Sequence, residues 1–165
     1  MKSCDKLLVA IEQIPPQGLH LDGRVSAGEL GIEDTDRIRC RHPVQFDLQT
    51  ARVRTDVLVE GHVDIVLQCR CDRCLVWYDE SVSVDDVCHL FENPTETVVD
   101  LTEGIREDIL LSFPQTCLCK EDCRGLCPTC GQNLNEEVCS CPPRESGNAL
   151  WHALENLDIA PTPPD

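Results

Sequence analysis

The sequence predicts an α+β fold, in which an antiparallel β-sheet is covered by one helix and followed by a cysteine-rich segment. Three observations predict it: alternating apolar and polar runs, one apolar stripe with a four-residue repeat, and closely spaced cysteines near the C-terminus. Alternation is typical of a strand with one buried face, and a period near 3.6 of an amphipathic helix. With 165 residues, of which 41% are hydrophobic, the chain has enough apolar residues for one modest core.

The clearest strand signal is a long hairpin. Between residues 53 and 67 the apolar residues keep a period of two with one slip, which predicts a half-buried strand bent at Gly61. A second alternating run, residues 76–87, follows a group of cysteines. We therefore expect residues 69–74 at the tip of the hairpin, and the looser alternation at residues 19–25 predicts one more strand.

A helix is expected over residues 100–113. Asp100 and Glu103 have the spacing of a capping box, and Pro114 would end the helix. The apolar residues within it repeat every four positions: Leu101, Ile105, Ile109 and Phe113. A single apolar stripe indicates that this helix covers the sheet. Before it, residues 92–97 contain Asn93-Pro94 and predict a loop.

The chain divides into three predicted parts. Residues 1–114 form the β-rich domain with its helix, and residues 115–143 form the cysteine-rich segment. Residues 144–165 are expected to hold a short amphipathic helix and a mobile, proline-rich tail. The longest unbroken apolar stretch is far short of the roughly 20 residues that span a bilayer, and the N-terminus does not resemble a signal peptide. We expect a cytoplasmic protein without membrane contact.

The 13 cysteines are the strongest chemical signal. Two pairs have C-x-x-C spacing, which lets one tight turn aim two sulfur atoms at one ion, and Gly131 after the second pair supplies the positive φ that such a turn needs. Few large apolar residues accompany the C-terminal group, so packing alone does not explain it. We predict two structural Zn²⁺ ions, held by Cys71, Cys74, Cys119, Cys123, Cys127, Cys130, Cys139 and Cys141.

Two partitions of these eight ligands are open. One pairs the hairpin-tip cysteines with Cys119 and Cys123, and leaves a local site from residue 127 to residue 141. The other joins both C-x-x-C pairs in one site and leaves the other four cysteines for the second. Reduced thiols without metal, disulfides and an iron–sulfur cluster are weaker alternatives, and we expect the remaining cysteines to be ordinary core or surface residues: Cys4, Cys40, Cys69, Cys88 and Cys117.

Charge limits the partners. With 30 acidic and 14 basic side chains the formal net charge is −16, which argues against nonspecific attraction to nucleic acid or anionic membranes. The distribution is uneven, because residues 37–54 carry five arginines against one aspartate. One face could therefore be basic. Four thiolates close a zinc site to activated water, so no hydrolytic chemistry is predicted, and we expect no enzyme.

Two stretches resemble the DUF177 or YceD family, whose members are described as large ribosomal RNA subunit accumulation proteins. The first is Cys71-Asp72-Arg73-Cys74-Leu75, and the second runs from the predicted helix through residues 118–135 to Cys139-Ser140-Cys141. The resemblance covers about residues 50–155. It implies a non-enzymatic ribosome-biogenesis factor that supports accumulation or processing of large-subunit (23S) ribosomal RNA, and it brings no catalytic residues.

How such a factor would act is a separate hypothesis. Arg70, Arg73 and Arg124 lie beside the predicted zinc turns, so we expect them to contact the RNA or a pre-ribosome. The acidic remainder would then meet a basic ribosomal protein or an RNA-processing enzyme. The alternative is an acidic protein-binding adaptor or holdase for such a basic partner, with no RNA contact of its own.

Overall fold

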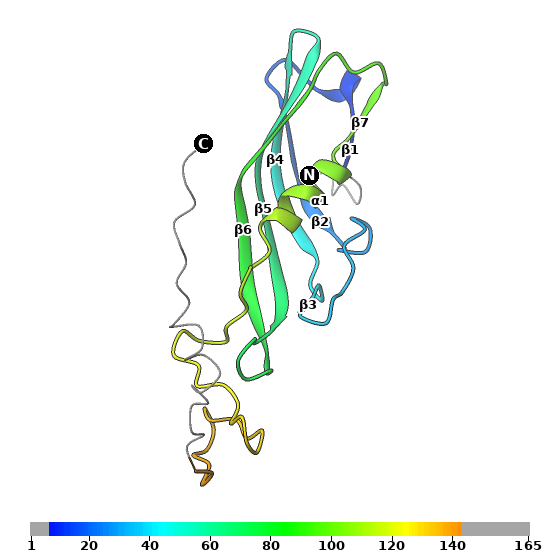
Figure 1. Cartoon of the computed structure of the whole chain (residues 1–165). Helices are drawn as coiled ribbons and strands as arrows, with labels where there is room; N and C mark the ends of the chain where they lie inside the picture. The colour runs from blue at the N-terminus through cyan, green and yellow to red at the C-terminus, as the bar shows by residue number, and fades with distance from the viewer. Residues whose placement is uncertain (1–6, 143–165) are drawn as a thin grey trace, which may run out of the picture.

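The structure is a computed structural model that describes residues 7–142. Figure 1 shows an elongated sheet with one helix across a face, and the cysteine-rich segment beyond the end of the longest hairpin. The elements are β1 (Leu8–Ala10), the 3-10 helix η1 (Ile11–Gln13), β2 (Leu19–Val25), β3 (Ile38–Arg39), β4 (Val44–Val53), β5 (Asp56–Arg70), β6 (Trp77–Phe91), β7 (Val98–Asp100) and α1 (Thr102–Leu111).

The main sheet is antiparallel throughout. Strand β5 lies at its centre and pairs with β6 along one side and with β4 along the other, and β2 extends the sheet beyond β4. The short β3 pairs with the last residues of β5, next to the hairpin tip. Strands β1 and β7 form a separate two-stranded ladder. The predicted antiparallel sheet with a covering helix, followed by a cysteine-rich segment, is confirmed.

One face of the sheet forms the core. The buried side chains alternate along the strands, as in Val57, Val59 and Val63 of β5, and α1 adds Ile105 and Ile109 from above. The helix is also fixed by a polar contact, because His89 Nε2 on β6 lies 2.7 Å from the Asp108 carboxylate on α1. Burial of this continuous apolar layer is what stabilises the sheet.

The register of the long hairpin shifts where the sequence shows its slip. Gly61 pairs with Val87, whereas Val63 pairs with Val84, so β6 has one extra residue there. Gly61 has φ of 155°, and a Cβ at this position would clash with the Asp47 carbonyl oxygen and lie 2.8 Å from Leu48 Cα. Glycine is required because the neighbouring strand β4 approaches too closely for any side chain.

Several predicted boundaries differ from the structure. The helix was expected over 100–113 but spans Thr102–Leu111, because Asp100 lies outside it and accepts a hydrogen bond from the Thr102 backbone N–H at 2.9 Å. The strand expected from residue 53 begins at Asp56, since Arg54 adopts a positive φ of 62° in a turn. The short helix and tail predicted for residues 144–165 lie outside the described residues.

The Gly61→Ala substitution tests the close approach of β4 and β5. We expect a loss of about 1–3 kcal/mol from the unfavourable backbone conformation and a similar amount from overpacking, measured by urea unfolding. Gly28→Ala is the matched control, because nothing lies within 4 Å of a Cβ at that position. Equal stability of the two variants would contradict the interpretation.

Candidate metal centres

The tip of the β5–β6 hairpin docks onto the cysteine-rich segment through Asp72. Its backbone N–H donates to the Cys117 carbonyl at 2.8 Å, and its carboxylate accepts a hydrogen bond from the Cys117 N–H at 2.9 Å. The same carboxylate forms an ion pair with Arg37 at 2.8 Å. The residue between the tip cysteines therefore aligns two segments that are far apart in the sequence.

Arg73 makes the second set of docking contacts. Its guanidinium Nη1 donates to the carbonyl oxygens of Cys123 at 3.0 Å and of Glu121 at 3.4 Å. Its own carbonyl accepts the Leu126 N–H at 3.1 Å. Gly125 permits this approach, because its φ is 74° and a Cβ there would lie 3.1 Å from the Arg73 carbonyl oxygen.

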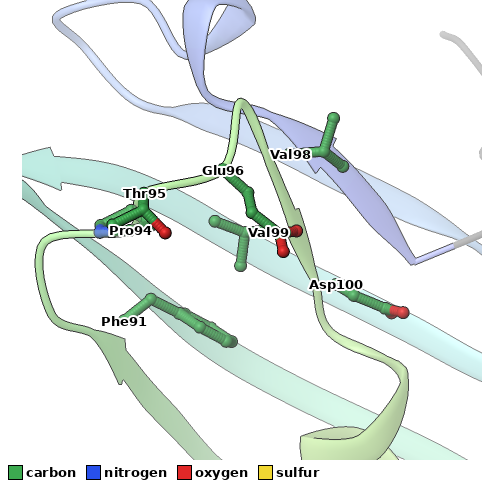
Figure 2. Close-up of a pocket in the computed structure, with 7 residues that line it drawn as sticks. All are labelled: Phe91, Pro94, Thr95, Glu96, Val98, Val99 and Asp100. Atoms are coloured by element: carbon green, nitrogen blue, oxygen red, sulfur yellow. The ribbon is translucent and has the colours of Figure 1, made fainter.

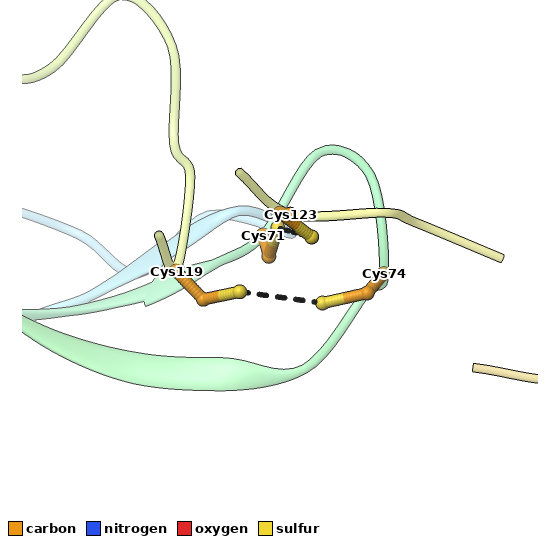
Figure 3. Close-up of side chains that lie close together, drawn as sticks. All are labelled: Cys71, Cys74, Cys119 and Cys123. Carbon is orange, nitrogen blue, oxygen red and sulfur yellow. Dashed lines mark hydrogen bonds between the residues drawn. The ribbon is translucent and has the colours of Figure 1, made fainter. Parts of the chain in front are cut away.

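The docking brings four sulfur atoms together at the tip. Cys71 Sγ lies 3.7 Å from Cys123 Sγ, and Cys74 Sγ lies 3.5 Å from Cys119 Sγ, as Figure 3 shows. All four sulfurs lie within 4.8 Å of one another. Tetrahedral Zn²⁺ with Zn–S bonds of 2.3 Å separates its ligands by about 3.8 Å. The thiol set therefore fits zinc in number, chemistry and spacing.

A second group of four thiols follows in the same segment. Cys127, Cys130, Cys139 and Cys141 also have their sulfurs within 4.8 Å of one another, and they are more exposed than the first group. This grouping corresponds to the first of the two partitions left open by the sequence. All twelve cysteines between residues 40 and 141 are free thiols in the structure.

The two C-x-x-C turns share one backbone geometry. In the first, the Leu75 N–H donates to the Cys71 carbonyl at 2.9 Å, and in the second the Gly131 N–H donates to the Cys127 carbonyl at 2.9 Å. The residue after each pair has a positive φ, 61° at Leu75 and 75° at Gly131. A bulky residue rarely adopts this conformation, so the first turn is held by its surroundings.

Backbone donors favour the thiolate at the first cysteine of each turn. Burial raises the pKa of Cys71, but N–H groups of Cys119, Cys74 and Arg73 outweigh it and lower the pKa to about 6. The N–H groups of Cys130 and Thr129 lower the pKa of Cys127 to about 6 as well. Burial and hydrogen bonds to neighbouring thiols raise the pKa of Cys119 to about 12. All four thiols of a group ionise together only if a cation compensates their charge.

Asn135 supports the first thiol group from the second loop. Its side-chain amide donates to Cys123 Sγ at 3.3 Å, and its Oδ1 accepts the Arg124 N–H at 2.9 Å. Amide donors to a ligating sulfur orient it, as outer partners do at metal sites. Asn135 was not among the predicted site residues, and its only signal in the sequence is its place between two cysteine pairs.

The remaining cysteines occupy ordinary positions. Cys69 and Cys117 are fully buried in the main core, Cys40 is half-buried and Cys88 is exposed. Burial, and then the neighbouring Cys117, raises the pKa of Cys69 to about 12, so this thiol stays protonated at neutral pH. Cys4 lies outside the described residues.

The three arginines proposed for RNA contact differ in their surroundings. The Arg73 guanidinium already donates a hydrogen bond to the Cys123 carbonyl oxygen in the docking contact described above. Arg70 donates through Nε to the Leu75 carbonyl at 3.4 Å, which holds its stem along the hairpin tip. Arg124 is exposed between the two thiol groups. The structure thus brings all three to the same end of the molecule.

A pocket of about 260 Å³ lies at the opposite end of β6. Figure 2 shows Phe91 and Val99 at its base, with the carboxylates of Glu96 and Asp100 at its rim. An apolar floor with acidic groups above it suits an aliphatic side chain that carries a positive charge. The pocket is separate from both thiol groups.

The family model for the large ribosomal RNA subunit accumulation protein YceD matches residues 84–158. An uncharacterized protein of Mycobacterium leprae is 28% identical over 138 residues, which cover 74% of this chain and 62% of that protein. The chloroplastic YCED homolog 1 of Zea mays is 36% identical over 72 residues, and that of Arabidopsis thaliana is 26% identical over 156 residues.

The matches are partial on both sides. They cover 43% of this chain and 24% of the maize protein, and 70% of this chain and 48% of the Arabidopsis protein. The chain therefore spans less than two thirds of the length of these relatives. No solved structure matches it. Within residues 7–142, no helix is long and apolar enough to cross a membrane. The family model and the two YCED homologs together show that the chain is similar to the YceD family, most clearly over residues 84–158.

Proposed function

We propose that this chain is a non-enzymatic factor that supports accumulation or processing of large-subunit ribosomal RNA. The observation that carries the proposal is the match of residues 84–158 to the YceD family model, together with the names of the plant relatives. Those names describe an accumulation factor rather than an enzyme. We expect it to act in the cytoplasm, although the two plant relatives are chloroplastic by name.

The proposal assigns structural Zn²⁺ to both thiol groups. Between residues 115 and 142, Leu118 and Leu126 pack against the first thiol group but are only partly buried. The buried residues there are three cysteines and one glycine, so the segment has no core of large apolar side chains: Cys117, Cys123, Gly125 and Cys127. Zinc supplies about 10–16 kcal/mol in small zinc peptides, which is enough to replace a missing core. Four thiolates leave no open coordination position, so the ions would hold the loops in place.

RNA contact in this proposal is local. Eight zinc-bound thiolates would take the formal charge from −16 to about −20, so broad electrostatic attraction to RNA is disfavoured. Arg70 and Arg124 flank the first thiol group and are free to reach phosphates, whereas Arg73 mainly positions the segment. The hairpin tip is therefore the end of the molecule that we assign to the RNA.

A second candidate function is an adaptor for a basic protein without RNA contact. The pocket at the other end of β6 favours it, because Glu96 and Asp100 lie beside an apolar floor that suits a lysine or arginine side chain. The other acidic residues between 79 and 122 would add to the long-range attraction of a basic partner. A ribosomal protein or an RNA-processing enzyme has the required basic charge.

Removal of one thiol tests the zinc assignment. We expect wild-type protein purified without chelator to hold about two Zn²⁺, and the Cys71→Ser variant to hold about one, by mass spectrometry. Cys88→Ser is the control, since Cys88 is exposed and belongs to neither group. Zinc-free wild-type protein, or a Cys71→Ser variant that keeps both ions, would disprove the assignment.

Filter binding to large-subunit rRNA fragments across a salt series tests the RNA contact. The Arg70→Gln/Arg124→Gln variant should bind more weakly, and each lost phosphate contact should reduce the slope of log K against log salt by about 0.7–0.9. Arg52→Gln removes a charge at the opposite end of the sheet and should change little. Binding of a basic ribosomal protein without any RNA binding would favour the adaptor function instead.

A further inference from the structure

The outward face of the sheet near the hairpin tip carries a basic and aromatic patch, of which only Arg70 has been assigned a role above. In register, Arg39 of β3 pairs with Gln68 of β5, and Arg70 of β5 pairs with Trp77 of β6. The residues between them, Ile38 and Cys69, are buried in the core. Because side chains alternate along strands, these arginines and Trp77 share the face opposite α1.

Arg39 and Trp77 form a stacked pair on this face. The Arg39 guanidinium carbon lies 4.0 Å from the centroid of the Trp77 ring, within the range of a cation–π interaction. Both side chains are half-buried, so the pair is held in place yet reaches the surface. The contact places a positive charge directly beside a large aromatic surface, and both guanidinium and indole groups can stack on a flat ligand.

Two more arginines flank the pair. Arg37 comes from the chain entering β3, and its carbonyl accepts the Arg70 N–H at 2.7 Å. Arg37 is fixed by its 2.8 Å ion pair with Asp72, which also holds the cysteine-rich segment. Arg39 thus contacts Trp77, Arg70 is its neighbour across the strands, and Arg37 lies next to Arg70 along the backbone. Of the acids on these registers, Asp72 is already paired and Asp79 is the other.

This composition contrasts with the rest of the chain. The formal net charge is −16, so a locally positive surface selects for an anionic ligand that touches only this end. Arginine groups bind phosphates, and aromatic or guanidinium planes stack on unpaired nucleobases. A base in a duplex is already stacked and paired, so the ligand that uses both features of the patch is single-stranded.

We propose that Arg39 and Trp77, flanked by Arg37 and Arg70, bind single-stranded RNA by stacking one unpaired base while the arginines contact the adjacent phosphates. The inference rests on the proposed role in ribosomal RNA accumulation and specifies which RNA is contacted and where. It adds Arg37, Arg39 and Trp77 to the tip arginines. An acidic protein segment would use the charges but not the stacking plane, and so is the alternative that the test separates.

Fluorescence of Trp77 gives a direct measurement. The chain has two tryptophans, so the Trp151→Phe variant reports Trp77 alone. Addition of a single-stranded RNA of about ten nucleotides should quench its emission, because a stacked base quenches an indole, and the same sequence as a duplex should bind more weakly. Binding of the single strand without any change in Trp77 emission would overturn the stacking contact.

Substitutions separate stacking from charge. We expect Trp77→Leu to weaken single-strand binding about 5- to 100-fold while leaving its salt dependence nearly unchanged. Arg39→Gln should weaken binding and also reduce the salt slope. Arg52→Gln, at the far end of β4, is the charge-matched control and should change affinity less than about twofold. Zinc content and urea unfolding of each variant show whether it is folded.

The outcomes distinguish this inference from the proposed function. If Trp77→Leu is folded and binds the single strand as wild type does, while Arg70→Gln/Arg124→Gln binds weakly, the patch is wrong and the proposed RNA contact stands. If the wild-type chain binds no single-stranded RNA but an acidic peptide binds to the arginines, both the patch and the RNA contact are overturned. Loss of large-subunit rRNA in cells that lack the chain would then still support the broader role.

Discussion

The contact between the four thiols of Cys71, Cys74, Cys119 and Cys123 is the interaction on which the C-terminal part of the molecule depends. It joins two turns that are 45 to 52 residues apart in the sequence. No large apolar side chain is buried between residues 115 and 142, so the hydrophobic effect offers little to hold this part. Hydrogen-bond donors outweigh burial and lower the pKa of Cys71 and of Cys123, and a divalent cation would allow the other two thiols to ionise beside them.

The sheet and the cysteine-rich segment are stabilised by different kinds of interaction. Strands β4, β5 and β6 are held by ladder hydrogen bonds and a continuous apolar layer under α1. The segment is held by thiols and by the polar docking contacts of Asp72 and Arg73. Asp72 connects the two systems, because it binds Cys117 on one side and Arg37 of the basic patch on the other. The order of the segment and the geometry of the patch are therefore coupled.

Local patterns in the sequence predicted the parts of the structure that depend on local physics. Alternating apolar residues around Gly61 predicted strand β5, and the apolar stripe before Pro114 predicted helix α1. The two C-x-x-C pairs predicted the two cysteine turns. Strand β4 was not predicted, although Val44, Phe46 and Leu48 alternate with polar residues. The grouping of thiols and the Arg39–Trp77 contact depend on which distant segments dock, and no local spacing determines that.

Hydrogen exchange with and without a zinc chelator measures most directly whether metal holds the segment to the sheet. The backbone N–H of Asp72, bound to the Cys117 carbonyl, and that of Leu126, bound to the Arg73 carbonyl, report the docking. Chelation should make both exchange fast, whereas the amides shared by β4 and β5 should remain protected because the apolar core is intact. Unchanged protection of Asp72 and Leu126 after complete removal of the metal would contradict a zinc-held interface, and so would loss of protection across the whole sheet.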